Sequence, residues 1–291
     1  MTLEVSIQGR EQVADWIETT LLARGTRQIG MDELQSLAAD EIAAGAPQVG
    51  LALGAMKRRS DLLGDRYPFR IHDVAVRAEP TAATFPYSAL LLLSAESVCR
   101  QLLFRTTTSE MEVLFERVTE KALAALWGHG GRALRFGWPS DFGRPQEFAA
   151  AVAWLAGQLG VEPGTGYRPP RRKDGGVDVV AWRPFPDGRA GFPIVLAQCT
   201  LQSDLITKAS DVEVRVWASW LVMDVDPVTA LVVPQTIPVG VLWDQLTLRC
   251  MVLERIRLAG LIAPTDDVEG MSDWINQTVE ALTPFLQGAE S

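Results

Sequence analysis

Apolar residues recur at helical spacing in the first part of the chain. Between Val13 and Leu22 they return every three to four positions, which predicts a helix within residues 8–45. Met31 and the acidic residues after it open a second helix in the same stretch. Further apolar blocks follow, with no motif that carries chemistry. The pattern predicts a mainly helical N-terminal region over residues 1–105, with an α+β region as the alternative, and the sequence does not identify its role.

The rest of the chain alternates between helical spacing and short apolar runs. Residues 177–182 and 193–199 predict two buried strands, which the turn Pro186–Arg189 joins. In order, the expected elements are a helix over 109–127, a strand over 132–138, a helix over 145–159, these two strands, a helix around 203–221, a strand over 230–234, and helices near 240–258 and 270–287. This order predicts an α/β (α+β) domain over residues 106–291, with a mixed sheet flanked by helices.

Composition places the chain among folded proteins that do not cross a membrane. Hydrophobic residues make up 47% and charged residues 22% of the 291 positions, and no apolar run approaches the roughly 20 residues that span a bilayer. The N-terminus lacks the basic and apolar stretches of a secretory signal. Cys99, Cys199 and Cys250 form no CxxC pair, which favours reduced thiols. We therefore expect a cytoplasmic protein with no membrane partner.

Charge is spread unevenly along the chain. The formal net charge is −9, which argues against a protein coated with nucleic-acid-binding surface. Residues 161–210 nevertheless hold seven Lys and Arg against five Asp and Glu, a net charge of +2. A locally basic segment in an acidic protein is consistent with a substrate that carries phosphate.

The same basic segment contains a carboxylate and an amide on neighbouring predicted strands. Asp178 enters the first strand after Gly175 and Gly176, and Gln198 lies near the end of the second. A buried amide in an apolar strand needs a partner. Oxygen atoms from a carboxylate and an amide are also ligands that Mg²⁺ accepts. The pair therefore marks a candidate metal site.

The stretch Lys173–Asp178, followed by Ala197–Thr200, resembles the motif of the PD-(D/E)XK restriction-endonuclease-like superfamily. It is also similar to endonuclease-like domains of bacterial defence and mobile-element proteins. The resemblance covers roughly residues 109–235 and implies a restriction-endonuclease-like fold. Gln198 stands in the (D/E) position, as in some members. Thr200 stands where the family places its lysine, which is the main departure.

The resemblance implies a site that binds Mg²⁺ or Mn²⁺. Asp178 would supply a charged ligand, Gln198 a neutral oxygen and Cys199 its backbone carbonyl. Lys208 is the substitute for the missing lysine, since some members carry this lysine on the following helix. The other interpretation of Lys208 is an exposed helix cation.

A third carboxylate is expected from a helix of the same domain. Glu116 fits the Phe-Glu pattern of the first core helix in related nucleases, and Glu147 competes with it. Exposed helix glutamates are the common alternative for both positions. Trp138 and Trp182 are kept as candidates for stacking on nucleobases.

The function that these residues predict is a metal-dependent nuclease. Its substrate is expected to be DNA more than RNA, in a role in bacterial antiviral defence. The alternative is a catalytically inactive, nuclease-like binding or scaffold subunit of a defence complex, which Thr200 and the acidic balance favour. A homo-oligomer and a defence-complex partner are both left open.

Overall fold

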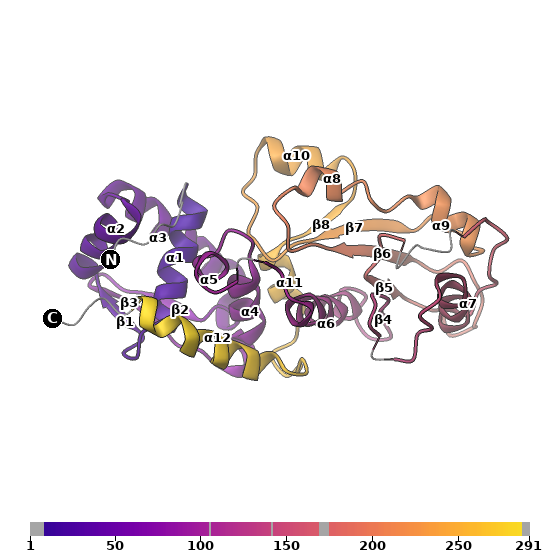
Figure 1. The fold of residues 1–291 in the computed structure, drawn as a ribbon, viewed down its shortest axis with the longest axis horizontal. Helices are drawn as coiled ribbons and strands as arrows, with labels where there is room; N and C mark the ends of the chain where they lie inside the picture. Colours follow the sequence, from indigo (N-terminus) through magenta and orange to yellow (C-terminus); the bar gives the residue numbers. More distant parts are fainter. Residues whose placement is uncertain (1–8, 105, 141, 169–174, 287–291) are drawn as a thin grey trace. The chain divides into compact units, whose positions relative to one another are not determined.

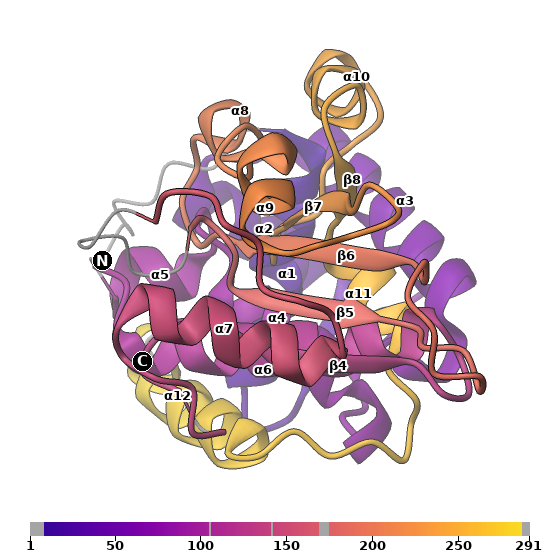
Figure 2. The same ribbon diagram turned by 90° about the vertical axis from the view of Figure 1, so that its right-hand side faces the viewer.

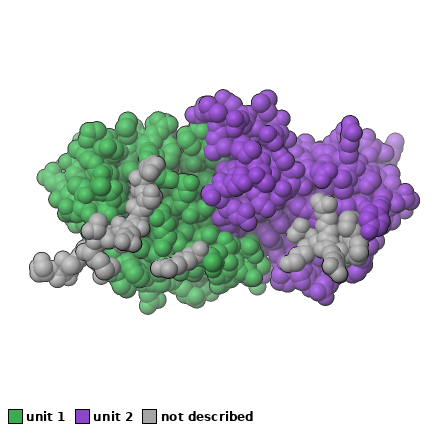
Figure 3. All heavy atoms as spheres, turned by 45° about the horizontal axis from the view of Figure 1, so that its top comes forward, with its two compact units in different colours: residues 1–114, 234–238, 254–291 green, residues 115–233, 239–253 purple. Residues whose placement is uncertain are grey.

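The computed structural model describes residues 9–104, 106–140, 142–168 and 175–286 (Figure 1). The chain divides into two compact units, which Figure 3 colours separately. Unit 1 comprises Met1–Leu114, Pro234–Pro238 and Glu254–Ser291, and unit 2 comprises Phe115–Val233 and Val239–Leu253. The sequence had placed the C-terminal helices with the nuclease-like part. In the structure, residues 254–291 group with the N-terminal residues, whereas residues 239–253 belong to unit 2.

Unit 1 is mainly helical and contains a small antiparallel sheet in the order β1-β3-β2. Its elements are α1 (Arg10–Ala23), β1 (Gln28–Gly30), α2 (Met31–Ile42), α3 (Ala46–Leu63), η1 (Gly64–Arg66), β2 (Phe69–Ile71), β3 (Ala75–Ala78), η2 (Ala82–Thr84), α4 (Phe85–Leu93), α5 (Val98–Leu102), α11 (Arg255–Leu261) and α12 (Met271–Leu286). Helix α4 is buried from Pro86 to Leu93, as expected for a helix that is apolar on every side. Helices α1, α11 and α12 contact it.

Charged and phenolic side chains are buried inside unit 1. We call them the buried charge cluster, and they are Asp15, Glu18, Arg59, Tyr67, Tyr87 and Arg255. Arg255 binds both oxygens of Asp15, at 2.8 and 2.7 Å. Arg59 reaches Asp15 and Glu18, each at 2.8 Å. Because Asp15 lies on α1 and Arg255 on α11, the cluster ties the C-terminal part of the chain to its N-terminal helices.

Unit 2 is built on a five-stranded mixed sheet in the order β4-β5-β6-β7-β8 (Figure 2). Its elements are α6 (Ser109–Leu126, which begins in unit 1), β4 (Arg132–Arg135), α7 (Phe148–Leu159), β5 (Val179–Trp182), β6 (Ile194–Cys199), α8 (Leu205–Lys208), α9 (Val214–Trp220), β7 (Val228–Val232), α10 (Val241–Thr247) and β8 (Met251–Leu253). Strands β4, β5 and β6 are antiparallel. Strands β6, β7 and β8 are parallel, so the chain passes from β6 to β7 and from β7 to β8 through helical crossovers.

Successive residues of the strands point to opposite faces of this sheet. Leu134, Val180 and Leu196 pack into one apolar core with residues of α7 and α9, and Figure 2 shows α7 running along β4 and β5. Arg135 alternates with Leu134 and faces the other side, where it binds Glu116 of α6. Polar side chains are found where β5 begins and β6 ends: Asp178 immediately precedes β5, and Gln198 lies near the end of β6.

The mixed α/β class with a sheet flanked by helices is confirmed. The small sheet of unit 1 fits the α+β alternative for residues 1–105, although its strands were not located, and β8 falls within the range 240–258 expected as one helix. These strands have three or four residues each, too few to show a period of two. Within the described part of the chain, no helix is long and apolar enough to cross a membrane.

Candidate functional site

Two glycines with left-handed backbones lead the chain to Asp178. Gly175 and Gly176 have φ of +68° and +80°, which other residues rarely adopt. A Cβ on Gly175 would lie 3.0 Å from the Trp217 ring, and one on Gly176 would lie 2.9 Å from the Asp211 carbonyl oxygen. The glycine pair therefore lets the strand that carries Asp178 approach the segment after α8.

Asp178 is held between the ends of β4 and β6. Its carbonyl oxygen accepts from the backbone N–H groups of Phe136 at 2.6 Å and Gly137 at 3.0 Å, and its own N–H donates to Ala197. Its carboxylate Oδ2 accepts from the Cys199 N–H at 2.7 Å. These bonds fix the position of the carboxylate beside the end of β6.

Gln198 and Lys208 meet at one carboxylate oxygen. Asp211 Oδ2 accepts from Gln198 Nε2 at 2.9 Å and lies 3.1 Å from Lys208 Nζ. The Gln198 side chain is buried, and its Oε1 has no hydrogen-bond partner among the described residues. If the Gln198 amide were rotated by 180°, its Oε1 would face the Asp211 carboxylate, and two acceptor oxygens would repel each other. The orientation in which Nε2 donates to Asp211 is therefore the favourable one. A buried acceptor is thereby left available to a ligand.

Glu116 reaches the same end of the sheet from α6. Its Oε2 accepts from Arg135 Nη1 at 2.5 Å, and the Arg135 side chain is 1% exposed. A Cβ on Gly137 would lie 2.5 Å from Glu116 Oε2, so a larger residue there would displace this carboxylate from its present position. Arg135 also donates to the carbonyl of Pro139. Glu116 is thus brought near the Asp178 strand, with an arginine as its partner.

The surroundings of the Cys199 thiol raise its pKa. Burial raises its pKa well above the usual value, and the nearby carboxylates of Asp178 and Glu116 raise it further. The thiol therefore stays protonated near neutral pH and is a poor nucleophile. Gly137, whose N–H donates to the Asp178 carbonyl, also borders the Glu116 carboxylate, so Asp178 and Glu116 lie close together.

Asp178 and Gln198 carry the kinds of oxygen atom that a hard divalent cation takes as ligands. Mg²⁺ is commonly held by one or two carboxylates and completed by water and substrate oxygen atoms. Asp178 offers such a carboxylate and Gln198 Oε1 an unpartnered oxygen. No group of three His, Cys, Asp or Glu that could hold a metal occurs among the described residues. The carbonyl of Cys199 as a ligand stays a prediction, and Lys173 and Asp174 of the motif lie outside the described residues.

Other sequence candidates have structural contacts of their own. Thr200, in the lysine position, is buried; its N–H donates to Val232 and its hydroxyl accepts from the Gln202 N–H. Glu147 is the N-cap of α7 and accepts from the N–H groups of the first helical turn. These contacts explain both residues without a catalytic role.

Asp211 and Arg135 are the site residues that sequence reasoning missed. Asp211 follows Lys208 by three positions, a spacing at which an acid and a base meet on a helix, and that signal could have found it. Arg135 interrupts the apolar strand Arg132–Phe136, and a buried arginine needs an acidic partner. Either residue would have been found by asking which charge pairs with a predicted site residue.

A cavity of about 550 Å³ lies in the same unit, on the Arg132 side of β4. Trp154, Trp182 and Phe142 line it together with Glu120 and Arg132. Glu120 lies one helical turn after Glu116 on α6. Trp182 thus borders a cavity, whereas Trp138 is 43% exposed on the loop after β4.

No protein-family model matches the chain, and no curated protein or solved structure resembles it significantly. The case for a function therefore comes from the chemistry of the side chains around Asp178 and Gln198. The likeness to PD-(D/E)XK nucleases likewise rests on those residues and on the order of the surrounding elements.

Proposed function

We propose that unit 2 is a metal-dependent nuclease of the restriction-endonuclease-like kind, which hydrolyses phosphodiester bonds of DNA. The observation that carries the proposal is that Gln198 and Lys208 meet at Asp211, while the Asp178 carboxylate accepts from the N–H of Cys199, the residue that follows Gln198. The buried, unpartnered Gln198 Oε1 supports it, because such an atom is costly unless a ligand uses it.

Each residue has a role that its contacts support. Asp178 and Gln198 Oε1 would hold Mg²⁺ or Mn²⁺, which would lower the pKa of an attacking water and neutralise the scissile phosphate. Lys208 would place its ammonium group beside the reacting phosphate, at a position that Asp211 fixes. Glu116 would add negative charge on the α6 side, and its ion pair with Arg135 would partly neutralise this charge.

A second candidate is a nuclease-like subunit that binds nucleic acid without cutting it. Thr200 in the lysine position favours it, as do the ion pairs that engage Glu116 with Arg135 and Lys208 with Asp211. A site whose charges already neutralise one another has less capacity to act on a substrate. Binding would then use the basic side chains of unit 2.

A plasmid-nicking assay separates the two candidates. The full-length protein is incubated with supercoiled DNA and Mg²⁺ or Mn²⁺, with and without EDTA, and single-stranded DNA and RNA serve as parallel substrates. The nuclease is expected to nick DNA only with free metal, and Asp178→Asn is expected to abolish nicking. The same change at Asp187, an exposed turn residue of this unit, is the matched control.

Equal nicking by the wild type and Asp178→Asn would overturn the assignment of this site. DNA binding without nicking in any metal would support the scaffold candidate. A role in bacterial defence, a cytoplasmic location, and association with a second copy or a defence-complex partner remain predictions that follow from the resemblance.

A further inference from the structure

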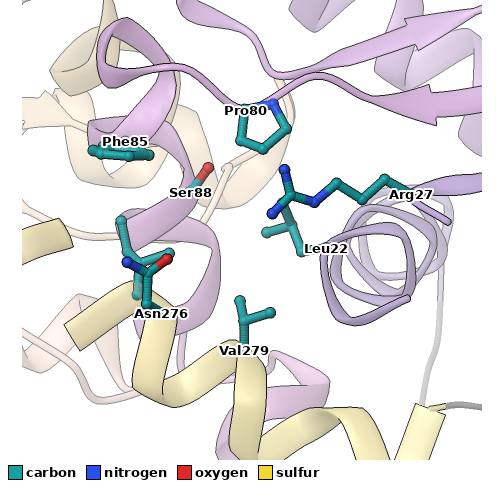
Figure 4. A pocket seen from close by; sticks show the side chains of 8 residues that line it. Leu22, Arg27, Pro80, Phe85, Ser88, Asn276 and Val279 are labelled. Carbon is teal, nitrogen blue, oxygen red and sulfur yellow. The ribbon is translucent and has the colours of Figure 1, made fainter. Parts of the chain in front are cut away.

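Unit 1 contains a small pocket that the proposed nuclease function does not involve (Figure 4). Its volume is about 140 Å³. The residues that line it all belong to unit 1 and are Leu22, Arg27, Pro80, Phe85, Ser88, Ile275, Asn276 and Val279. A ligand role for this pocket can therefore be tested independently of the site in unit 2.

Arg27 is the charged group of this pocket. Figure 4 shows its guanidinium group pointing into the open space between the other labelled side chains. Among the described residues, the guanidinium has no hydrogen-bond or ion-pair partner, in contrast to Arg24 nearby, which binds Glu33. An arginine that borders a pocket without a partner is available to an anionic ligand.

The backbone of Arg27 is fixed in an uncommon conformation. Its φ is +50°, a left-handed value that favours glycine or asparagine. Its N–H donates to the Arg24 carbonyl at 3.0 Å, and its carbonyl accepts from the Ala78 N–H at 2.8 Å. Both bonds hold the turn between α1 and β1, so the position from which the guanidinium extends is set by the fold.

Two neutral polar groups border the same space. Figure 4 shows the Asn276 amide and the Ser88 hydroxyl on the side of the pocket opposite Arg27. Ser88 is buried and bonds to the Thr84 carbonyl at 3.1 Å, so its side chain is fixed. The Asn276 amide has N–H donors to offer. Figure 4 draws the amide oxygen of Asn276 toward the open space, and turning this amide over would bring its NH2 group there as a second donor for an anionic oxygen held by Arg27.

The remaining walls are apolar and limit the size of the ligand. Leu22, Phe85 and Val279 contribute hydrocarbon surface, with Pro80 and Ile275. A cavity of about 150 Å³ with apolar walls is known to accept benzene. The volume here thus has room for one six-membered ring or a short branched chain. Sites with apolar walls and a few fixed polar groups are typical of small organic ligands.

We propose that this pocket binds a small organic carboxylate. The guanidinium of Arg27 would receive the carboxylate in its planar fork, and the apolar walls would receive the hydrocarbon body. A carboxylate suits the site because its two oxygens match the donor geometry of arginine. A long-chain acid or a nucleotide exceeds the space.

Calorimetric titration of the full-length protein tests the proposal with benzoate and 3-methylbutanoate as probes. We expect at least one of them to bind at one site per chain. Arg27→Gln should weaken that binding roughly tenfold or more, because it removes a charge-assisted hydrogen bond. Arg77→Gln is the matched control, an exposed arginine of β3 in the same unit, and should leave the affinity unchanged.

Two further binding measurements show which part of the ligand the pocket recognises. Benzyl alcohol, which lacks the charge, should bind much more weakly than benzoate to the wild type. Val279→Phe should block benzoate by filling the pocket while leaving Arg27 in place. Thermal unfolding checks that each variant is folded.

The proposal is overturned if neither probe binds the wild type, or if Arg27→Gln binds benzoate as well as Arg77→Gln does. Inorganic phosphate that binds as tightly as benzoate would also overturn it, because the apolar walls would then have no part in recognition.

Discussion

The two units each contain a cluster of charged side chains, and the clusters differ in how their polar atoms are used. In the buried charge cluster of unit 1, all four carboxylate oxygens of Asp15 and Glu18 accept hydrogen bonds. In unit 2, Gln198 Oε1 is buried without a partner, and Lys208 and Asp211 are both partly exposed. Every carboxylate oxygen of the first cluster is therefore paired, whereas the second leaves a buried acceptor for a ligand.

This difference between the two clusters indicates that the first contributes to stability and the second to function. Charges buried without solvent must be paired, because an unpaired charge in the interior is very costly. Charges at a strand end that solvent reaches cost little to rearrange and can bind a substrate. We therefore expect substitutions in unit 1 to change the free energy of unfolding and substitutions in unit 2 to change activity.

The strongest test of this comparison is Arg255→Met. Its guanidinium binds both oxygens of Asp15 and is fully buried, so its removal leaves a buried carboxylate short of its partner. We expect the free energy of unfolding to fall by about 3–5 kcal/mol. Urea denaturation measures it, with Arg77→Met as an exposed control from the same unit. A loss no larger than the control's would show that the buried charge cluster does not stabilise unit 1.

Lys208→Met tests the other side of the comparison. If Lys208 acts on the phosphate, nicking should slow by about a hundredfold. The free energy of unfolding should change by less than about 1 kcal/mol, because the Lys208–Asp211 pair is partly exposed. Lys121→Met, which removes an exposed lysine of α6, is the control for net charge. Unchanged nicking by the Lys208 variant would remove the substitute lysine from the site.

Gln198→Met asks whether a buried residue of unit 2 serves binding. The change keeps the size of the side chain and removes both the bond to Asp211 and the unpartnered oxygen. The two effects oppose each other, so stability should stay within about 1 kcal/mol. Mn²⁺ affinity, measured by titration calorimetry, should fall roughly tenfold. Gln202→Met is the exposed control. Unaltered Mn²⁺ affinity would refute the role of Gln198 as a metal ligand.

The sequence predicted local features of the fold better than features that depend on distant residues. The order of helix and strands from α6 to β7 followed from periodicity. The position of Asp178 beside β6 followed from the motif. The grouping of α11 with α1 did not, because the Asp15–Arg255 pair joins residues 240 positions apart. Long-range ion pairs leave no periodic signal along the chain.

The candidate site shows the same limit. Asp178 and Gln198 were found from their strands, and Lys208 from a spacing known in similar proteins. The carboxylate that joins Gln198 to Lys208 was missed, because Asp211 approaches β6 only through the close contact of its backbone with Gly176. Tertiary packing therefore determined the part of the site that local pattern could not predict.

The smallest predicted effect concerns pH and the buried charge cluster. Burial raises the pKa of Glu18 above its ordinary value of 4.5, and the neighbouring charge of Asp15 adds to the rise. A group with a raised pKa in the folded state contributes stability below its unfolded pKa, and this contribution is lost as pH rises through the folded pKa. Asp15 is shifted the other way, so its contribution is lost only in more acidic solution, below 3.8.

Glu18→Gln isolates this contribution, because glutamine has no proton to lose. We expect the wild type to lose stability relative to the variant as pH rises from about 5 to 8, by about 1.4 kcal/mol for each pKa unit of the shift that lies in this window. Urea denaturation of both proteins across the window measures the difference, and Asp15 stays ionised throughout it. A difference that grows in the opposite direction would mean that Arg59 and the two tyrosines outweigh burial at Glu18. Glu18 would then stay ionised within the buried charge cluster over this pH range.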